Sequence, residues 1–166
     1  MSTNPAALAA QVTAQPVPRW LRLQPHQLAV ALSLLALASH TAVWGWSAPW
    51  GSSWATGGAL SALAVGWLIW AWTALQREPW VVSPQPQPRV LVDEGPYRFT
   101  RNPMALGRAG LMLSAGLAGG VPFMALAAAA LLVIQNQLHI PFEEAQLRRA
   151  FGGWYSDYAA SVRRWL

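Results

Sequence analysis

Four apolar segments that are almost free of acidic and basic residues constrain the fold more than any other feature of the chain. They cover about residues 27–46, 58–75, 104–117 and 123–138. A helix of about 20 residues crosses the roughly 30 Å of hydrocarbon in a bilayer. Because 54% of residues are hydrophobic and only 10% are charged, the chain has too few charged residues for the water-exposed surface of a soluble domain of its size. We therefore predict an all-α polytopic membrane protein with four transmembrane helices.

The positions of the arginines predict how these helices are oriented. All eleven basic residues are Arg, and they lie before the first span, in the loop 77–103 and after the fourth span, with Arg108 about one turn into the third span. The two other loops carry none. Since Arg-bearing loops stay on the cytoplasmic side, both termini and the loop 77–103 should be cytoplasmic, in a membrane of the bacterial inner-membrane type.

The remaining segments complete the predicted organisation. Residues 1–18 carry no charge and no apolar period, which is typical of a disordered N-terminal tail, and residues 19–166 should form a single membrane domain. After Pro141, apolar residues recur every three or four positions, which predicts a C-terminal amphipathic interfacial helix over 142–165, with its arginines, Arg164 among them, facing water and headgroups. A cleaved signal peptide ending near Ala38 is the alternative for the first span, but the apolar run continues to Trp46.

Several classes of site are disfavoured. Cysteine is absent, which excludes disulfides and thiolate metal ligands, and the three histidines lie too far apart in sequence to suggest a metal site, so we predict none. The arginines are scattered rather than clustered on one face, so nucleic acid is not an expected partner. His40 lies within the first span, where an interhelical hydrogen bond is a simpler role than catalysis. Nothing in the sequence indicates the oligomeric state.

Polar residues gather at the cytoplasmic end of the hairpin formed by the third and fourth spans. The hairpin should bring Arg101, Asn102 and Arg108 near Gln135, His139 and the pair Glu143 and Glu144. Polar groups are costly in a membrane, so this cluster predicts a functional pocket in which a carboxylate could bind a cationic group. The alternative for the two glutamates is that they only stabilise the start of a helix.

Two segments resemble a known enzyme family: GPYRFTRNPMALG at 95–107, and PFEEAQLRRAFGGWYSDYAASVRRWL from Pro141 to the end. They are similar to the paired motifs of the isoprenylcysteine carboxyl methyltransferase and phospholipid methyltransferase superfamily, integral membrane enzymes that use S-adenosylmethionine. Their order and spacing around a helical hairpin agree with that pattern. The chain departs from it at Asn102, where many members have His, and at Ala105, where a Tyr is usual.

This resemblance implies a methyltransferase that moves a methyl group from S-adenosylmethionine to a lipid-like acceptor, either an isoprenylcysteine carboxylate or a phospholipid amine. Glu144, His139 and Arg108 are the catalytic candidates. The resemblance places the cofactor on residues of both segments: Tyr97, Arg98, Arg101, Asn102, Pro103, Gly107, Glu143, Glu144, Tyr155 and Tyr158. The alternative function is a non-catalytic membrane scaffold or lipid-binding protein. A small transporter is disfavoured, since the chain shows no internal repeat.

Overall fold

The computed structural model describes residues 24–48, 51–77 and 91–166, and within them all regular structure is helical. The predicted tail 1–18 and residues 78–90 of the predicted loop lie outside the described residues. The elements in chain order are α2 (Pro25–Trp44), α3 (Trp54–Gln76), the 3₁₀-helix η2 (Gly95–Arg98), α4 (Pro103–Gly119), α5 (Phe123–Ile134), the π-helix η3 (Gln135–His139), α6 (Ile140–Phe151) and α7 (Gly153–Ser161).

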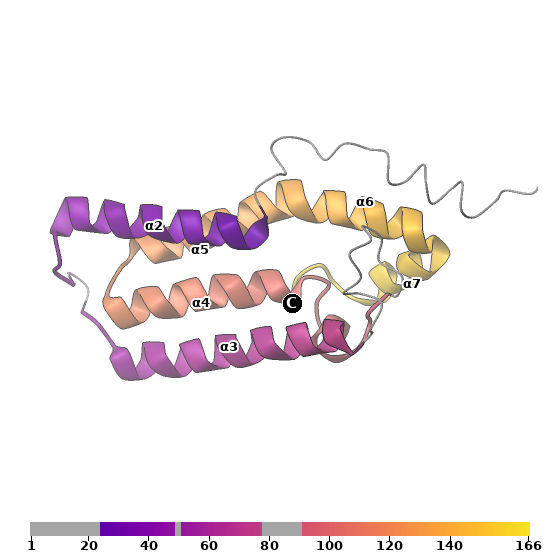
Figure 1. Cartoon of the computed structure of the whole chain (residues 1–166), viewed down its shortest axis with the longest axis horizontal. Helices are drawn as coiled ribbons and strands as arrows, with labels where there is room; N and C mark the ends of the chain where they lie inside the picture. Colours follow the sequence, from indigo (N-terminus) through magenta and orange to yellow (C-terminus); the bar gives the residue numbers. More distant parts are fainter. Residues whose placement is uncertain (1–23, 49–50, 78–90) are drawn as a thin grey trace, which may run out of the picture.

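Helices α2, α3, α4 and α5 lie side by side in one bundle (Figure 1). Helix α4 packs along α3 on one side and α5 on the other, and α2 packs mainly on α5. The end of α2, the start of α3 and the α4–α5 turn meet at one end of the bundle, where the backbone N–H of Ser53 donates to Leu117 O at 3.2 Å. The opposite end carries α6, α7 and the C-terminus (Figure 1).

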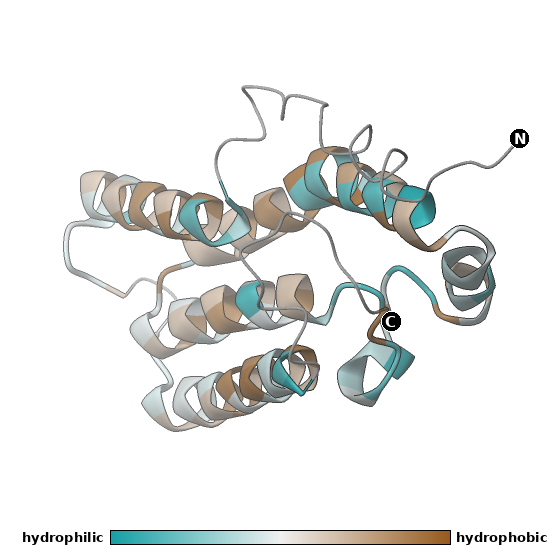
Figure 2. Cartoon of the chain, turned by 45° about the vertical axis from the view of Figure 1, so that its right-hand side comes forward, coloured by the Kyte–Doolittle hydropathy of each residue, from teal (hydrophilic) through white to brown (hydrophobic). Residues whose placement is uncertain are grey.

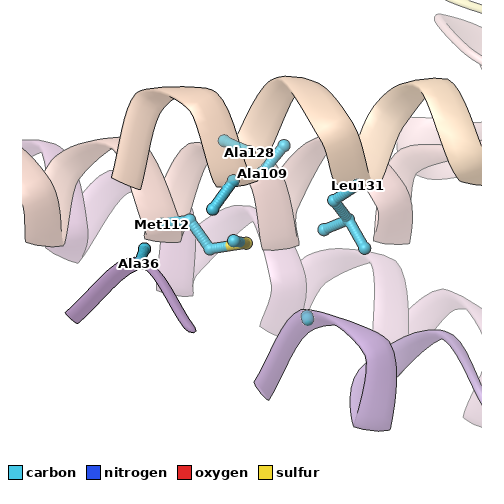
Figure 3. Close-up of a cluster of buried hydrophobic side chains, with 7 residues drawn as sticks. Ala36, Ala109, Met112, Ala128 and Leu131 are labelled. Carbon is cyan, nitrogen blue, oxygen red and sulfur yellow. The ribbon is translucent and has the colours of Figure 1, made fainter. Parts of the chain in front are cut away.

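Small side chains form the core between α2, α4 and α5. Ala36, Ala109 and Ala128 meet there beside Met112 and Leu131, so the helix backbones approach closely (Figure 3). Large apolar side chains instead point outwards and are exposed in the isolated chain: Leu34, Leu35, Val43, Leu63, Ile69, Leu126 and Val133. A bundle with small residues inside and large apolar residues outside is suited to a lipid environment.

Three helices among the described residues are long and apolar enough to cross a membrane: Pro25–Trp44, Trp54–Gln76 and Phe123–Phe151. Helix α4, the third predicted span, has 17 residues and holds Arg108. Pro103 fits its first turn, where the missing N–H would have no partner, and Gly120 ends it in the left-handed conformation at φ 66°.

The fourth span was predicted to end near residue 138, before a separate helix. In the structure the helix instead continues through Pro141. Helix α5 continues through η3 into α6, and the five residues Gln135–His139 form the wider π turn directly before this proline. A proline inside a helix removes one hydrogen bond and collides with the preceding turn. A wider turn at that place relieves the collision, so the helix passes through.

The C-terminal segment also differs from the predicted single helix over 142–165. Helix α6 ends at Phe151, Gly152 adopts φ 56°, and α7 covers only Gly153–Ser161. Because a residue with positive φ cannot continue an α-helix, the chain turns at Gly152. Tyr155 and Tyr158 then pack against Leu91 under the end of the bundle.

Candidate functional site

A cavity opens at the end of the bundle where both recognised sequence segments meet. Its walls come from the end of α3, the segment around η2, the start of α4, and helices α6 and α7, and its lining residues are Leu75, Leu91, Val92, Tyr97, Arg101, Asn102, Glu143, Glu144, Leu147, Tyr155 and Tyr158. Hydrophilic residues are concentrated in α6, α7 and the connections at this end, whereas the bundle helices are mainly apolar (Figure 2). The cavity therefore joins a polar region to an apolar one.

Glu144 is the most heavily bonded acidic group of this site. The residue is buried, and both carboxylate oxygens accept hydrogen bonds from Arg164, from Nε to Oε1 at 3.0 Å and from Nη2 to Oε2 at 2.8 Å. Arg101 approaches the same carboxylate, with 3.3 Å between Nη1 and Oε1. Two guanidinium groups thus surround one buried carboxylate and fix its orientation.

The last residues of the chain are tied to the first motif through their backbone. The N–H of Arg101 donates to Arg163 O at 3.0 Å, and Arg164 O accepts from Thr100 Oγ1 at 2.9 Å and from Asn102 Nδ2 at 3.3 Å. Trp165 adds a hydrogen bond from Nε1 to Asn136 Oδ1 at 3.1 Å. We call residues 162–166 the C-terminal arm.

The sequence missed the role of this arm. Arg164 was predicted to face water and headgroups; the prediction was wrong, because its side chain turns inwards to Glu144 and Asn136. The place of Arg164 in the second recognised segment was the signal that could have identified it.

Three tyrosines form the aromatic side of the cavity. Tyr158 donates from its hydroxyl to the Tyr97 carbonyl at 2.8 Å, which joins α7 to η2, and Tyr155 is almost fully buried. Burial raises the pKa of Tyr97, with the negative charge of Glu143 as the second cause, and burial likewise raises the pKa of Tyr158. Both phenols therefore remain neutral at physiological pH.

A second polar group lies beside the cavity and consists of side chains from α4, η3 and α6. Glu143 lines the cavity and is exposed to it, in contrast to its neighbour Glu144. Arg108 and His139 interact electrostatically with Glu143. Arg108 also donates from Nη2 to Gln135 Oε1 at 3.3 Å, so α4 is joined to η3. Two of the three catalytic candidates, Arg108 and His139, therefore belong to this group, and the third is Glu144.

Two other predicted cofactor residues act through packing. The Pro103 carbonyl accepts from Trp67 Nε1 at 2.8 Å, and a Cβ at Gly107 would lie 2.5 Å from the Leu68 side chain. Both contacts hold α3 against the start of α4. Ala105, where the family pattern has Tyr, is only 3% exposed, so its neighbours already fill the space around it.

Arg98 and His40 lie away from the cavity. Arg98 is exposed and lines a separate depression with Asp157. His40 Nε2 lies 2.9 Å from Ser47 O, just beyond its own helix, so this contact is not the predicted interhelical bond. The described residues include no group of three or more His, Asp or Glu that could hold a metal ion.

Comparison with known proteins agrees with this arrangement. The family model described as phospholipid methyltransferase matches residues 52–153, from just before α3 to the first residue of α7. The chain belongs to the phospholipid methyltransferase family. Comparisons with curated proteins and with solved structures found no match. The match confirms the superfamily that the two sequence segments predicted.

Family membership assigns the general activity. A phospholipid methyltransferase family member with three apolar helices of spanning length is an integral membrane methyltransferase acting on lipid-like substrates. Such an enzyme needs a methyl donor. The matched range includes Tyr97, Arg101, Asn102, Glu143 and Glu144. It ends at the first residue of α7 and does not include the C-terminal arm.

Proposed function

We propose that this protein transfers a methyl group from S-adenosylmethionine to a lipid acceptor in the cavity at the end of the bundle. The observation that carries the proposal is the set of groups that line that cavity: an exposed carboxylate, Glu143, a guanidinium, Arg101, that is paired with Glu144, and aromatic side chains. S-adenosylmethionine carries an ammonium, a carboxylate and a sulfonium, and it supplies an electrophilic methyl group. The charges of the cavity are complementary to those of the cofactor.

We assign the binding roles from the partners that each side chain already has. Glu143 would bind the cofactor ammonium, since it opens to the cavity, and Arg101 and Asn102 would bind the carboxylate. The ring of Tyr97 would lie against the positive sulfonium, because aromatic faces attract cations. Glu144 would position Arg101 rather than touch the cofactor, since Arg164 already occupies both of its oxygens.

Positioning two reactants in one closed site would supply most of the catalysis. An acceptor carboxylate needs no base, whereas an acceptor amine must lose a proton as the new bond to carbon forms. Of the two predicted bases, we favour His139, because both oxygens of Glu144 accept hydrogen bonds from arginine. His139 lies one turn before Glu143 on the inner face of the same continuous helix.

We further propose that α4 is a fourth membrane crossing and that both termini are cytoplasmic. Contacts between α3 and α4 support the crossing, because they run from Gly57 against Ala118 at one end to Trp67 against Pro103 at the other. These contacts cover about half of α3, which is itself of spanning length. In this arrangement α7 lies at the cytoplasmic membrane surface.

Binding of S-adenosylmethionine to the purified protein in a neutral detergent, measured by calorimetry, tests the proposal. We expect saturable binding, with Glu143→Gln weakening affinity about tenfold or more, since a charge-assisted hydrogen bond contributes roughly 1.5–3 kcal/mol. Asp157→Asn is the matched control, because it removes one exposed acidic charge from α7 outside this cavity. Absence of binding in folded wild-type protein would contradict the proposal and favour a scaffold that retains the fold.

A further inference from the structure

A second cavity lies on the side of the bundle, next to the C-terminal arm. Its volume is about 450 Å³, and its walls include Leu106 of α4, Leu132 and Val133 of α5, Asn136 of η3 and Trp165 of the arm. Val133 is 60% exposed and belongs to a helix of spanning length. In a membrane this cavity therefore opens towards the hydrocarbon chains of the lipids. We call it the lateral cavity.

The arm forms the wall between the lateral cavity and the cavity of the candidate site, which we call the cofactor cavity. The two cavities share no lining residue. Arg164 donates from Nε and Nη2 to Glu144, which lines the cofactor cavity, and from Nη1 to Oδ1 of Asn136, which lines the lateral cavity, at 3.3 Å. Trp165 Nε1 donates to the same Asn136 oxygen at 3.1 Å. A single guanidinium group therefore bridges the two cavities.

The arm is held by hydrogen bonds that belong to no helix. It follows α7, which ends at Ser161, and its backbone accepts hydrogen bonds from residues 100–102. The Arg164 side chain is 32% exposed, so water can replace its partners when the arm moves away. A segment held in this way opens at a lower free energy than helices packed in a bundle.

The position of the arm matters because methyl transfer requires contact between the two reactants. The accepting atom must come within about 3–3.5 Å of the methyl carbon. An acceptor whose hydrocarbon chain lies in the lateral cavity has Arg164 and Trp165 between its head group and the cofactor cavity. Transfer from this side is therefore blocked while the arm keeps the position that it has in the structure.

We propose that the C-terminal arm is a gate between the two cavities, closed in this structure, which opens to let a lipid acceptor in the lateral cavity reach the methyl donor. This inference rests on the proposed function and adds how access to its site is controlled. The closed arm would keep the bound cofactor apart from the membrane until an acceptor is present, as closing segments do in other enzymes. The alternative is a fixed arm that only stabilises the fold.

The chain contains no cysteine, so a single introduced thiol reports opening at its own position. Thr100→Cys places one beside the arm, where Thr100 Oγ1 donates to Arg164 O, and Ser114→Cys is the matched control between α3 and α4. Both residues are buried, at 0% and 2% exposure. N-ethylmaleimide in neutral detergent should label Thr100→Cys about tenfold or more faster, because opening of the arm leaves the bundle folded. A little denaturing detergent should then accelerate only the labelling of Ser114→Cys.

Removal of the Arg164 side-chain contacts tests whether the arm itself uncovers Thr100. Arg164→Gln should accelerate the labelling of Thr100→Cys about tenfold, since it removes charge-assisted hydrogen bonds that close the arm. An unchanged rate would overturn the inference, because another segment would then uncover Thr100. Equal rates for Thr100→Cys and Ser114→Cys, with equal dependence on denaturing detergent, would also overturn it, since the arm would then open only when the whole protein unfolds.

A reversible lock tests whether opening is needed for transfer. Phe99→Cys/Arg163→Cys places two thiols on exposed residues outside both cavities, on segments joined by the hydrogen bond from Arg101 N to Arg163 O. A short bis-methanethiosulfonate connects the thiols, and a reductant releases them. S-adenosylmethionine with a tritiated methyl group is the donor, and the acceptor probes are a short-chain phosphatidylethanolamine and an S-prenyl cysteine.

The locked protein should lose about tenfold or more of its transfer to the better probe and recover it on reduction, while its affinity for S-adenosylmethionine changes less than about twofold. The single-cysteine variants, treated identically, are the controls and should keep their activity. Undiminished transfer by the locked protein would overturn the inference.

These outcomes are separate from failure of the proposed function. A protein that does not bind S-adenosylmethionine would contradict the proposed function, whereas the labelling of Thr100→Cys would still show whether the arm opens by itself. If the wild type binds S-adenosylmethionine but methylates neither probe, the labelling comparison alone decides for or against the gate.

Discussion

Two adjacent glutamates of the candidate site differ in whether their carboxylate oxygens are accessible to a ligand. Glu143 and Glu144 are chemically identical, yet Glu144 is buried with both oxygens paired to arginine, while Glu143 opens to the cavity. Neighbouring positions on a helix point in directions about 100° apart, which is the source of the difference. The carboxylate with accessible oxygens is the one suited to a cationic ligand.

Arg164 should contribute to stability through Glu144. Arg164→Gln removes a bidentate ion pair from a buried carboxylate and leaves it with Arg101 alone, so we expect unfolding to become easier by about 2 kcal/mol. The measurement is unfolding in mixed micelles with increasing denaturing detergent. Arg163→Gln is the matched control, since its side chain is exposed, and it should change stability by less than about 0.5 kcal/mol. Equal effects of the two variants would contradict the role of Arg164.

Sequence motifs predicted most of the residues that line the cavity, but not the contacts that organise them. Arg101, Asn102 and Glu144 were predicted because they belong to recognisable patterns. The contribution of Arg164 was not predicted, because its carbonyl accepts a hydrogen bond from Asn102, which lies 62 positions earlier in the chain. A contact of this kind depends on the path of the chain after α7, which returns to the segment before α4. The local sequence does not determine that path directly.

At the scale of elements, the close approach of α3 and α4 depends on glycine. A Cβ at Gly57 would lie 2.5 Å from the backbone nitrogen of Ala118, whereas a Cβ at Gly58 would meet nothing within 4 Å. Further along the same pair of helices, Ser61 Oγ donates to Ser114 Oγ at 2.9 Å. Small residues thus allow the two helices to pack with little separation.

Gly57→Ala should therefore destabilise the bundle. The new methyl group meets backbone, which cannot change rotamer, so α3 must move away from α4 at a cost of about 1–3 kcal/mol. Gly58→Ala changes the next residue identically and should be neutral or stabilising by up to about 1 kcal/mol, since alanine favours a helix. Thermal unfolding in detergent compares the two. A loss of stability in Gly58→Ala equal to that in Gly57→Ala would show that packing on Ala118 is not the cause.

Three of the four apolar segments correspond to described helices that are long and apolar enough to cross a membrane, because length and hydrophobicity are direct properties of the sequence. The boundaries after residue 138 were less predictable. The fourth span was predicted to end near residue 138 and a separate helix to cover 142–165, but η3 lets the helix continue past Pro141, and the chain turns at Gly152. A proline is compatible with either outcome, and the choice depends on whether a wider turn can form before it.

At the scale of the whole molecule, polarity separates the two ends of the bundle. The described arginines lie at or near the end that holds the cavity, whereas the other end, with the α2–α3 and α4–α5 connections, carries uncharged residues. Helices α2, α3 and α5 contain no acidic residue and no arginine, and Arg108 of α4 lies in the half nearer the cavity. This separation supports the proposed orientation, in which the described arginines lie on the cytoplasmic side of the membrane.

That orientation can be measured directly because the chain contains no cysteine. Ser52→Cys places a thiol at the uncharged end, and Ala160→Cys places one on an exposed position of α7. In intact cells a membrane-impermeant maleimide should label Ser52→Cys alone, and after the membrane is opened it should label both. Labelling of both variants in intact cells would place the two ends on one side and contradict an odd number of crossings between residues 52 and 160. Labelling of Ala160→Cys alone would preserve the bundle but reverse it, so that the cavity would face away from the cytoplasm and the cofactor supplied there.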